Sequence, residues 1–370
     1  MNNAATSWQK APGVAEAVFD ALVKRPGAAN RGGIEHFDVF SEVRTEMAHL
    51  LGVSYPNNIA LGCNATWALN AAIFGYPFEP GDTVLTTCSE HNSVLRVLHE
   101  LKSRLPLNIV YLETDLTGRI LPETWSAALK SANPKLAIFT HASNVTGAVN
   151  DAAALSKAAK AAGAHVLVDV SQTCGIEEID VNAWDADIVV FTGHKYLLGP
   201  QGTGGLYVKP SLTLKPYIIG GTGSHSDLPT MPENMPARLE AGTGNEPSFH
   251  GLLAALKWSK ANPLRKEELG NIHSFLSREL AAAGADIICP TGPCTPTFSF
   301  NIPGMAPSEV GFILEESYDI ICRTGLHCAP KIFKCIERAE GTVRLSLSRF
   351  TTMEEAKSVV QAVKDIADAV

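Results

Sequence analysis

Lys195 is the residue in this sequence whose neighbours most clearly suggest chemistry. It lies in the segment FTGHKYLLGPQGTGG, directly after an apolar run, with Thr192, Gly193 and His194 before it. A lysine amine at the end of a strand can form an imine with an aldehyde cofactor, and a nearby hydroxyl and imidazole can bind phosphate oxygens. A surface lysine in a glycine-rich turn is the alternative, and this segment alone does not decide between them.

An aspartate closes a second apolar run, HVLVDVSQ. Asp169 would be costly to bury without a charged partner, and a protonated pyridine nitrogen is such a partner. A carboxylate that keeps this nitrogen protonated makes the ring an electron sink for a carbanion. Gln172 could donate a hydrogen bond to the phenolate oxygen of the same ring. The alternative for Asp169 is the N-cap of a following helix.

Two further segments follow apolar runs and contain candidate binding groups. In LGCNATWALN a strand turns into a helix, so the backbone N–H groups near Ala65 and Thr66 would face an anion. In TTCSEHNSVL, His91 follows the next strand, where an imidazole could stack on a flat ring or transfer protons. Each segment alone is a weak signal, because such turns and loop histidines are common in structural roles.

Alternating strands and helices must position these residues. Between about residues 58 and 209 we predict strands at NIALG, DTVLTT, LNIVYLE, KLAIFTH, HVLVDVS and ADIVVFTG. One of the intervening helices is predicted to begin at the N-cap Asp151 and to end at a left-handed Gly163. This alternation indicates a largely parallel sheet covered on both faces, with ligands beyond the carboxyl ends of its strands.

The pattern changes towards the C-terminus. A Gly-, Thr- and Ser-rich stretch at 220–226, followed by LPTMPENMP, predicts a long functional loop. Beyond it, helices are predicted at NPLRKEELGNIHSFLSRELAAAG and TMEEAKSVVQAVKDIADAV, and strands at PTFSFNI and TVRLSLS. We therefore expect a large domain over 14–255 and a small α+β domain made of 1–13 and 256–370.

Composition excludes several classes of protein. The chain has 370 residues, of which 45% are hydrophobic, enough for about two domains of roughly 150 residues each. The net charge of -8 and the lack of a basic run interleaved with aromatics argue against a nucleic-acid ligand. No run approaches the roughly 18 apolar residues of a membrane span, and MNNAATSWQK does not resemble a secretory signal, so a cytoplasmic location is expected.

The eight cysteines are too sparse for a disulfide framework, and most are expected to be buried thiols. There is no CxxC pair that would predict zinc or a redox dithiol. Cys289 and Cys294 in CPTGPC could in principle ligate a metal, but no second pair or histidine cluster accompanies them. We therefore expect no metal site.

Taken in order, these motifs resemble the fold-type I pyridoxal-phosphate enzymes of the class V aminotransferase family, most closely the short-loop cysteine desulfurase and selenocysteine lyase branch. The resemblance spans nearly the whole chain, through NNAATSW, CNAT, EHNSVL, SNVTG, DVSQ, TGHK, EAGTGN, RTGLHCAP and GTVRLSLSRF. It implies an α/β fold with a mainly parallel seven-stranded sheet in the large domain and a smaller α+β domain. Pyridoxal 5'-phosphate (PLP) is the implied cofactor.

The resemblance also implies roles for individual residues. Lys195 would form the Schiff base with the cofactor, and Asn144, in THASNVTG, would lie near both cofactor and substrate carboxylate. The other implied cofactor contacts are Asp169 at the pyridine nitrogen, Gln172 at the phenolate oxygen, His91 stacked on the ring, and Ala65, Thr66, Thr192 and His194 at the phosphate. Thr243, in EAGTGN, resembles a residue that reaches the phosphate of the neighbouring subunit, which implies a homodimer.

By the same resemblance, the enzyme would convert L-cysteine or L-selenocysteine to L-alanine. Lys195 would remove the α-proton, and Arg344, in TVRLSLS, would bind the substrate carboxylate. Cys328, in ICRTGLHCAP, would attack the substrate sulfur and retain it as a persulfide, for reduction by a thiol or transfer to an acceptor protein in sulfur mobilisation and iron–sulfur cluster assembly. The attack needs a thiolate, of which a free cysteine supplies about a few per cent at neutral pH. His327 is available to assist it.

Two alternative functions remain open. One is another PLP reaction, such as a C–S lyase or an aminotransferase, in which Cys328 is not catalytic. The other is a non-catalytic scaffold, against which the intact set of Lys195, Asp169, His91 and Arg344 argues. The chain also departs from the family pattern, with Asn2 in place of Asp, Trp67 in place of a common Glu, and Cys322 in place of an apolar residue.

Overall fold

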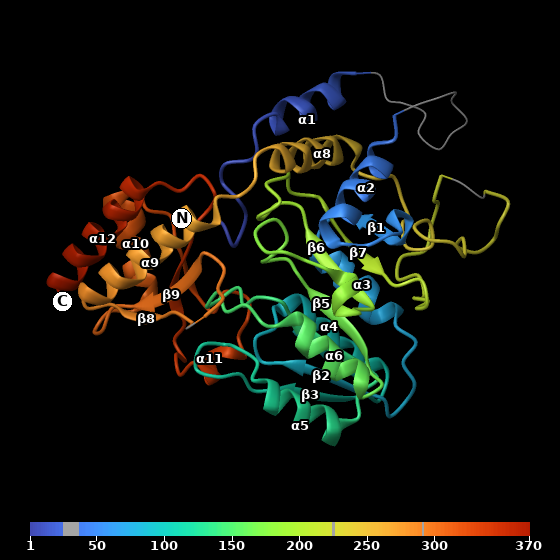
Figure 1. The fold of residues 1–370 in the computed structure, drawn as a ribbon, viewed down its shortest axis with the longest axis horizontal. Coiled ribbons are helices and arrows are strands. Elements are labelled where there is room, and N and C mark those ends of the chain that lie inside the picture. The colour runs from blue at the N-terminus through green and yellow to red at the C-terminus, as the bar shows by residue number, and fades with distance from the viewer. Residues whose placement is uncertain (25–36, 224–225, 291) are drawn as a thin grey trace.

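The computed structural model describes residues 1–24, 37–223, 226–290 and 292–370. Figure 1 shows a larger group of elements around one sheet and a smaller group, containing the C-terminus, around a second. The first sheet consists of β1 (Ile59–Gly62), β2 (Thr83–Thr87), β3 (Asn108–Leu112), β4 (Leu136–Thr140), β5 (His165–Asp169), β6 (Ile188–Thr192) and β7 (Gly204–Val208). The second consists of β8 (Asp286–Ile288), β9 (Thr297–Asn301), β10 (Arg323–Gly325) and β11 (Thr342–Ser346).

Helices surround both sheets. Those of the first half of the chain are α1 (Val14–Val23), α2 (Val39–Leu51), the 3-10 helix η1 (Pro56–Asn58), α3 (Ala65–Gly75), α4 (Asn92–Arg104), α5 (Pro122–Ala132), α6 (Ala152–Ala161) and α7 (Val181–Trp184). The remaining ones are α8 (Glu246–Ala261), α9 (Lys266–Ala282), α10 (Pro307–Tyr318), α11 (Ile332–Cys335) and α12 (Met353–Asp368).

The large sheet confirms the predicted α/β fold. Its strand order is β1-β7-β6-β5-β4-β2-β3, and only β7 runs antiparallel to its two neighbours. All six predicted strands are present. The seventh, β7, was not predicted because its sequence begins with two glycines, which weaken strands. A Cβ on Gly205 would lie 2.5 Å from the Ala60 carbonyl oxygen, so close packing of the backbones requires glycine there.

Each central strand sends alternate side chains into two hydrophobic cores. In β4, Ala137 and Phe139 pack beneath α2, α5, α6 and α8, whereas Leu136 and Ile138 pack beneath α3 and α4. This alternation explains why the strand is apolar throughout, because both of its faces are buried. The helix predicted after residue 150 is confirmed as α6, with Asp151 accepting a hydrogen bond from Ala154 N and Gly163 at a φ of 81°.

The second sheet is antiparallel, in the order β10-β11-β9-β8. Helices α9, α10 and α12 cover it, and the predicted C-terminal helices and strands are present as α9, α12, β9 and β11. The N-terminus reaches this sheet too, because Asn2 bridges to Ser346 and Ala4 N donates to the Ser346 hydroxyl over 2.8 Å. The proposed domain boundary at 255/256 falls within the continuous helix α8 and stays a prediction.

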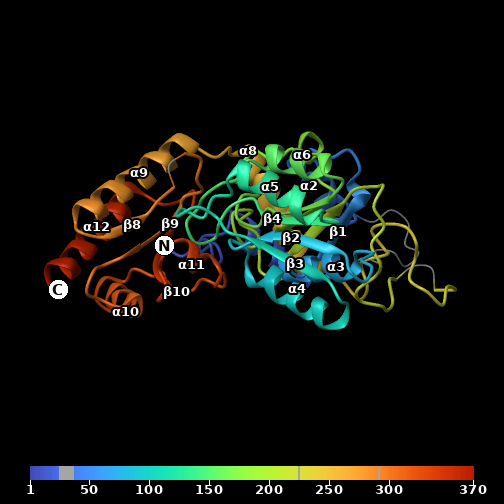
Figure 2. The same cartoon turned by 90° about the horizontal axis from the view of Figure 1, so that it is seen from below.

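The predicted long loop lies between β7 and α8. No helix or strand is present in its described parts, 209–223 and 226–245, and residues 224–225 of the predicted stretch lie outside the described residues. Figure 2 shows this connection projecting from the large group of elements, away from the C-terminus. Within the described ranges, no helix combines the length and the apolar composition needed to cross a membrane.

Candidate active site

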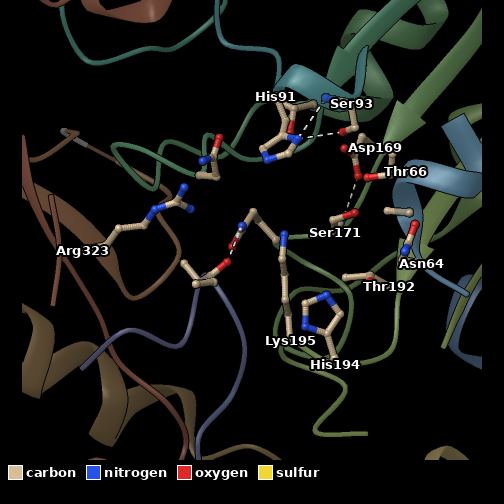
Figure 3. A pocket seen from close by; sticks show the side chains of 16 residues that line it. Asn64, Thr66, His91, Ser93, Asp169, Ser171, Thr192, His194, Lys195 and Arg323 are labelled. Atoms are coloured by element: carbon tan, nitrogen blue, oxygen red, sulfur yellow. Dashed lines mark hydrogen bonds between the residues drawn. The ribbon is translucent and has the colours of Figure 1, made fainter. Parts of the chain in front are cut away.

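A cavity of about 200 Å³ lies at the carboxyl edge of the large sheet, facing β10 of the small sheet. Figure 3 shows side chains from several connections pointing into it. Its lining residues are Ala4, Ala5, Asn64, Ala65, Thr66, His91, Ser93, Thr140, Asn144, Asp169, Ser171, Gln172, Thr192, His194, Lys195 and Arg323. The cavity therefore brings together nine of the predicted site residues, which are separated by up to 130 positions between Ala65 and Lys195.

Lys195 projects into the cavity from the turn after β6. Desolvation is the main cause that lowers the pKa of its amine to about 8; the positive charges of Arg344 and Arg323 lower it further, against the attraction of Asp169. Near neutral pH a larger share of this amine than of an exposed lysine is therefore able to act as a nucleophile or a base.

Asp169 ends β5 and is 5% exposed. Its Oδ1 accepts a hydrogen bond from Ser171 N over 2.9 Å, which fixes the carboxylate at the cavity wall. No helix begins directly after Asp169, because the next one, α7, begins at Val181; the N-cap alternative for Asp169 therefore does not apply. Gln172 donates from Nε2 to the Ala4 carbonyl over 3.1 Å and holds the N-terminal segment against the site.

The N-terminus of α3 lies at another part of the cavity. Asn64 is its N-cap and accepts a hydrogen bond from Trp67 N over 2.8 Å, which leaves the first N–H groups of the helix, near Ala65 and Thr66, facing the cavity. A Cβ on Gly204 would lie 2.8 Å from the backbone of Asn64, so this approach of β7 requires glycine. Thr192 and His194 line the cavity together with this helix end.

His91 is the N-cap of α4, and its ring is held by two contacts. Nδ1 lies 2.8 Å from the Ser93 hydroxyl and accepts a hydrogen bond from Ser93 N over 3.1 Å. Desolvation, followed by the positive charges of Lys195, Arg323 and Arg344, lowers the pKa of His91 to about 3. The imidazole is therefore neutral at physiological pH, with its ring directed into the cavity (Figure 3).

Arg344 is fully buried in β11 beside Asn144. Its Nη1 donates to the Asn144 carbonyl over 2.8 Å, and its Nη2 donates to Asn2 Oδ1 over 3.1 Å. Its Nε has no hydrogen-bond partner, and no carboxylate among the described residues forms a salt bridge with it. A buried guanidinium with spare donors and no counter-charge is a suitable receptor for the carboxylate of a ligand.

Cys328 lies in the loop after β10, and its sulfur contacts Arg323. The distance from Arg323 Nη2 to Cys328 Sγ is 2.8 Å. His327 and Cys328 both adopt left-handed backbone conformations, with φ of 48° and 59°, which are costly for residues with a side chain and are typical of functional loops. His327 is held by a contact of 2.8 Å between Nε2 and the Thr342 hydroxyl, so the residue in hydrogen-bond contact with the Cys328 sulfur is Arg323.

Three predicted site residues do not line this cavity: Cys328, Arg344 and Thr243. The first two are linked to it through Arg323 and Asn144, respectively. Thr243 is exposed and lines a separate cavity of about 580 Å³ that also contains Arg44 and Glu240. Its predicted contact with a neighbouring subunit therefore stays a prediction.

Several lining residues were not predicted. Arg323 is the most consequential of them, and its place in the RTGLHCAP segment, shortly before Cys328, was the available signal. Ser171, two residues after Asp169, could have been found in the same way. Ala4 and Ala5 carry no chemical group that would mark them, and only the folded N-terminus places them at the cavity.

The polar groups of the cavity fit PLP. Ser171 Oγ, Gln172 Oε1 and His194 Nδ1 are buried and have no partner among the described residues, so the cavity offers unused hydrogen-bonding groups to a polar ligand. A helix N-terminus suits a phosphate, a carboxylate suits a pyridinium, and a lysine whose pKa is lowered suits an aldehyde. These features together define a PLP-binding enzyme of the fold-type I class.

Comparison with known proteins places this site within a family. The model of the aminotransferase class-V family matches residues 1–359, and the chain belongs to that family. The predicted cofactor, PLP, is thereby confirmed for this chain.

Relatives with similar sequences share a common name. A probable cysteine desulfurase of Methanothermobacter thermautotrophicus is 32% identical over 336 residues, covering 88% of this chain and 83% of the relative. One of Pyrococcus abyssi is 29% identical over 381 residues, covering 99% and 93%. The solved apo structure of the cysteine desulfurase of Thermococcus onnurineus is 28% identical, with a TM-score of 0.90 over 100% of this chain and 94% of that chain.

Proposed function

We propose that this chain is a cysteine desulfurase that converts L-cysteine to L-alanine, retains the sulfur as a persulfide on Cys328, and also accepts L-selenocysteine. The observation that carries the proposal is the 2.8 Å contact between Arg323 and the Cys328 sulfur, because Arg323 also lines the cavity that contains Lys195. A thiol with a cationic neighbour thus stands beside a site for an amino acid and PLP. The names of the relatives support the same activity.

In this proposal the predicted residues hold the cofactor. Lys195 would hold its aldehyde group, and Asp169 would pair with its pyridine nitrogen. The remaining contacts would be made by cavity-lining residues: Ala65, Thr66, Thr192 and His194 at the phosphate, Gln172 at the phenolate oxygen, and His91 and Asn144 at the ring. When bound, PLP supplies an electron sink for the substrate α-carbon.

The same cavity would orient the substrate. Arg344 binds the α-carboxylate with the donors that the protein leaves unused, and Asn144 positions that guanidinium through its carbonyl. Lys195, whose pKa is lowered to about 8, is then able to take the α-proton at neutral pH. His91 stays neutral because its pKa is lowered to about 3, so it can stack without adding a positive charge.

Cys328 would perform the step that defines the activity. Its thiolate attacks the substrate sulfur, the bond between that sulfur and the substrate β-carbon breaks, and a persulfide remains on Cys328. The Arg323 guanidinium stabilises the attacking thiolate through a charge-assisted hydrogen bond. A selenium-containing side chain would meet the same residues.

The test measures alanine and persulfide formation from L-cysteine, and selenide release from L-selenocysteine, for the wild type, Cys328→Ala and the matched control Cys289→Ala. We expect Cys328→Ala to lose cysteine turnover by at least about 100-fold, since no other cysteine among the described residues lines the cavity or contacts Arg323. Cys289→Ala, a half-buried thiol of the small domain, should retain it. Pyruvate or keto-acid production unaffected by Cys328→Ala would instead indicate a C–S lyase or an aminotransferase.

We also propose a homodimer in which Thr243 completes the phosphate site of the other subunit. A mixing experiment tests it with Lys195→Ala and Thr243→Ala subunits, each impaired as a pure dimer. In a mixed dimer the Thr243→Ala subunit keeps its lysine and receives an intact Thr243, so one of the two sites is restored. Each mixed dimer should have about half of the wild-type activity, and a fully exchanged equal mixture about a quarter. If mass spectrometry shows that the subunits have exchanged but the mixture recovers no activity, the shared site is contradicted.

The pathway context belongs to the same proposal. A sulfur-acceptor protein for iron–sulfur cluster assembly is what the family resemblance leads us to expect, and the cytoplasmic location expected from the sequence is part of the same proposal. Transfer of labelled sulfur from Cys328 to a scaffold or carrier protein, compared with Cys328→Ala, would test the acceptor.

A further inference from the structure

Cys88 and Cys335 form a thiol pair outside the candidate active site. Cys88 directly follows β2 and is 9% exposed, whereas Cys335 ends the short helix α11 and is partly exposed. The two side chains lie close enough to interact, although 247 positions separate them in the sequence. Neither lines the cavity that contains Lys195.

Contacts on both sides hold the pair together. On one side, Cys88 N donates to the Leu112 carbonyl over 2.9 Å, which fixes the end of β2 against the end of β3. On the other side, α11 is tied to the same strand end by the 2.8 Å ion pair between Lys334 and Glu113. In Figure 1, α11 lies beside β2 and β3 although it belongs to the C-terminal part of the chain.

Two further contacts support this placement of α11. The Lys331 amine lies 4.3 Å from the centroid of the Tyr111 ring, one residue before Leu112. On its other face, Ile332 and Phe333 of α11 pack into a buried cluster with Val145. The geometry of the thiol pair therefore rests on ionic, cation–π and apolar contacts rather than on the two cysteines alone.

We propose that Cys88 and Cys335 are a redox-active dithiol, which hydrogen peroxide converts to a disulfide that joins the β2–α4 connection to α11. The two joined segments flank the candidate active site, since His91 follows Cys88 closely and Cys328 precedes α11. They already touch there, because Asn92 N donates to the Cys328 carbonyl over 2.6 Å.

The chemistry assigns different roles to the two thiols. Cys335 is the more exposed and attacks the peroxide, forming a sulfenic acid and releasing one water. Cys88 then attacks the sulfenic sulfur; the S–O bond breaks, the S–S bond forms, and the Cys88 proton leaves with the hydroxyl group as a second water. Burial, and then the neighbouring Cys335, raises the pKa of Cys88 to about 12, so Cys88 is the less reactive thiol and suits the second step.

The experiment treats the holoenzyme with a small excess of hydrogen peroxide, blocks remaining thiols with iodoacetamide and digests with trypsin, a glutamate-specific protease and a protease that cleaves before aspartate. This digestion isolates each relevant cysteine, with Cys88 in peptide 82–90, Cys335 in 335–337 and Cys328 in 324–331. We expect peptides 82–90 and 335–337 to be joined, with the mass of the pair lowered by two hydrogens, and to separate after reduction with dithiothreitol.

Variants make the result specific. Cys335→Ser and Cys88→Ser should each abolish the linked peptide, whereas Cys289→Ser should retain it. Oxidation should also raise the thermal midpoint of the wild type by a few degrees, but not that of either Ser variant, because the crosslink restricts the unfolded chain. Recovery of Cys88 and Cys335 as separate alkylated or overoxidised residues, or linkage of Cys335 to Cys328, would overturn the proposal.

Discussion

Arg323 Nη2 lies 2.8 Å from the sulfur of Cys328, and this contact joins the cavity of the large sheet to the loop after β10. The guanidinium therefore places a positive charge beside the thiol. His327, the neighbour in sequence, instead contacts Thr342. Burial, then the positive charges of Arg344 and Arg323, lowers the pKa of His327 to about 2, so it contributes no charge.

Replacing Arg323 is therefore expected to slow the reaction of Cys328 with iodoacetamide. We expect about a 10-fold decrease in Arg323→Gln at pH 7.5, since hydrogen bonds to charged groups contribute about 1.5–3 kcal/mol. Arg323→Lys should be intermediate because it keeps the charge without the planar fork. Arg265→Gln, which breaks an exposed ion pair with Glu268, is the control and should match the wild type. Equal alkylation rates in all four proteins would contradict the role of Arg323.

Asn2→Asp is expected to weaken substrate binding. The Asn2 side-chain oxygen lies 3.1 Å from Arg344 Nη2, so a carboxylate there would pair with the buried guanidinium and compete with the substrate carboxylate. The KM for L-cysteine should rise by roughly 10-fold, with a smaller change in kcat, as expected when a competing charge-assisted hydrogen bond is added. Asn2→Ala removes the contact without adding charge and should leave KM near the wild-type value. An unchanged KM in Asn2→Asp would refute the competition.

Glu90 is expected to make folding stability fall with rising pH. Its carboxyl group is fully buried, accepts hydrogen bonds from the Thr87 hydroxyl and Thr140 N, and has a pKa that desolvation raises to about 8. The pKa of Glu90 is about 4.5 in the unfolded chain, and the native state keeps the proton to a higher pH. The stability contributed by protonated Glu90 is therefore complete below about pH 4.5 and is lost as pH rises to about 8.

Glu90→Gln mimics the protonated acid at every pH and provides the test. Between pH 5 and pH 8, the free energy of unfolding of the wild type should fall relative to that of Glu90→Gln by on the order of 3 kcal/mol. Urea unfolding at several pH values measures the difference. Parallel curves for the two proteins would show that Glu90 does not titrate in this range.

His141 is expected to make folding stability fall as pH is lowered, the opposite of the effect of Glu90. It is 5% exposed, its Nδ1 lies 2.9 Å from the Thr173 hydroxyl, and desolvation lowers its pKa to about 4. Because the unfolded chain binds this proton at about pH 6.5, the stability contributed by neutral His141 is lost as pH falls from about 6.5 to 4. Between pH 7 and pH 5, the free energy of unfolding of His141→Asn should therefore fall by about 2 kcal/mol less than that of the wild type, as measured by urea unfolding. Identical losses would contradict this assignment.

The sequence by itself determined the local elements and the chemical groups at their ends. Apolar runs alternating with helical segments predicted six of the seven strands of the large sheet, because burial on both faces leaves a continuous apolar signal. Lys195, Asp169 and His91 could be placed at the carboxyl edge, because parallel strands end on the same side of a sheet. Of the strands in the large sheet, only β7 was not predicted, because its glycines are required by close backbone packing rather than by strand propensity.

The tertiary structure decided which distant groups meet. Arg344 contacts Asn2 and Asn144, which are 342 and 200 positions away, and Cys88 meets Cys335 across a similar distance. Periodicity and spacing describe a segment of a few turns, whereas these contacts depend on how two sheets and their connections pack. The same reason explains why Arg323, and not the adjacent His327, contacts the Cys328 sulfur: left-handed backbone at 327 and 328 turns the loop so that the guanidinium reaches it.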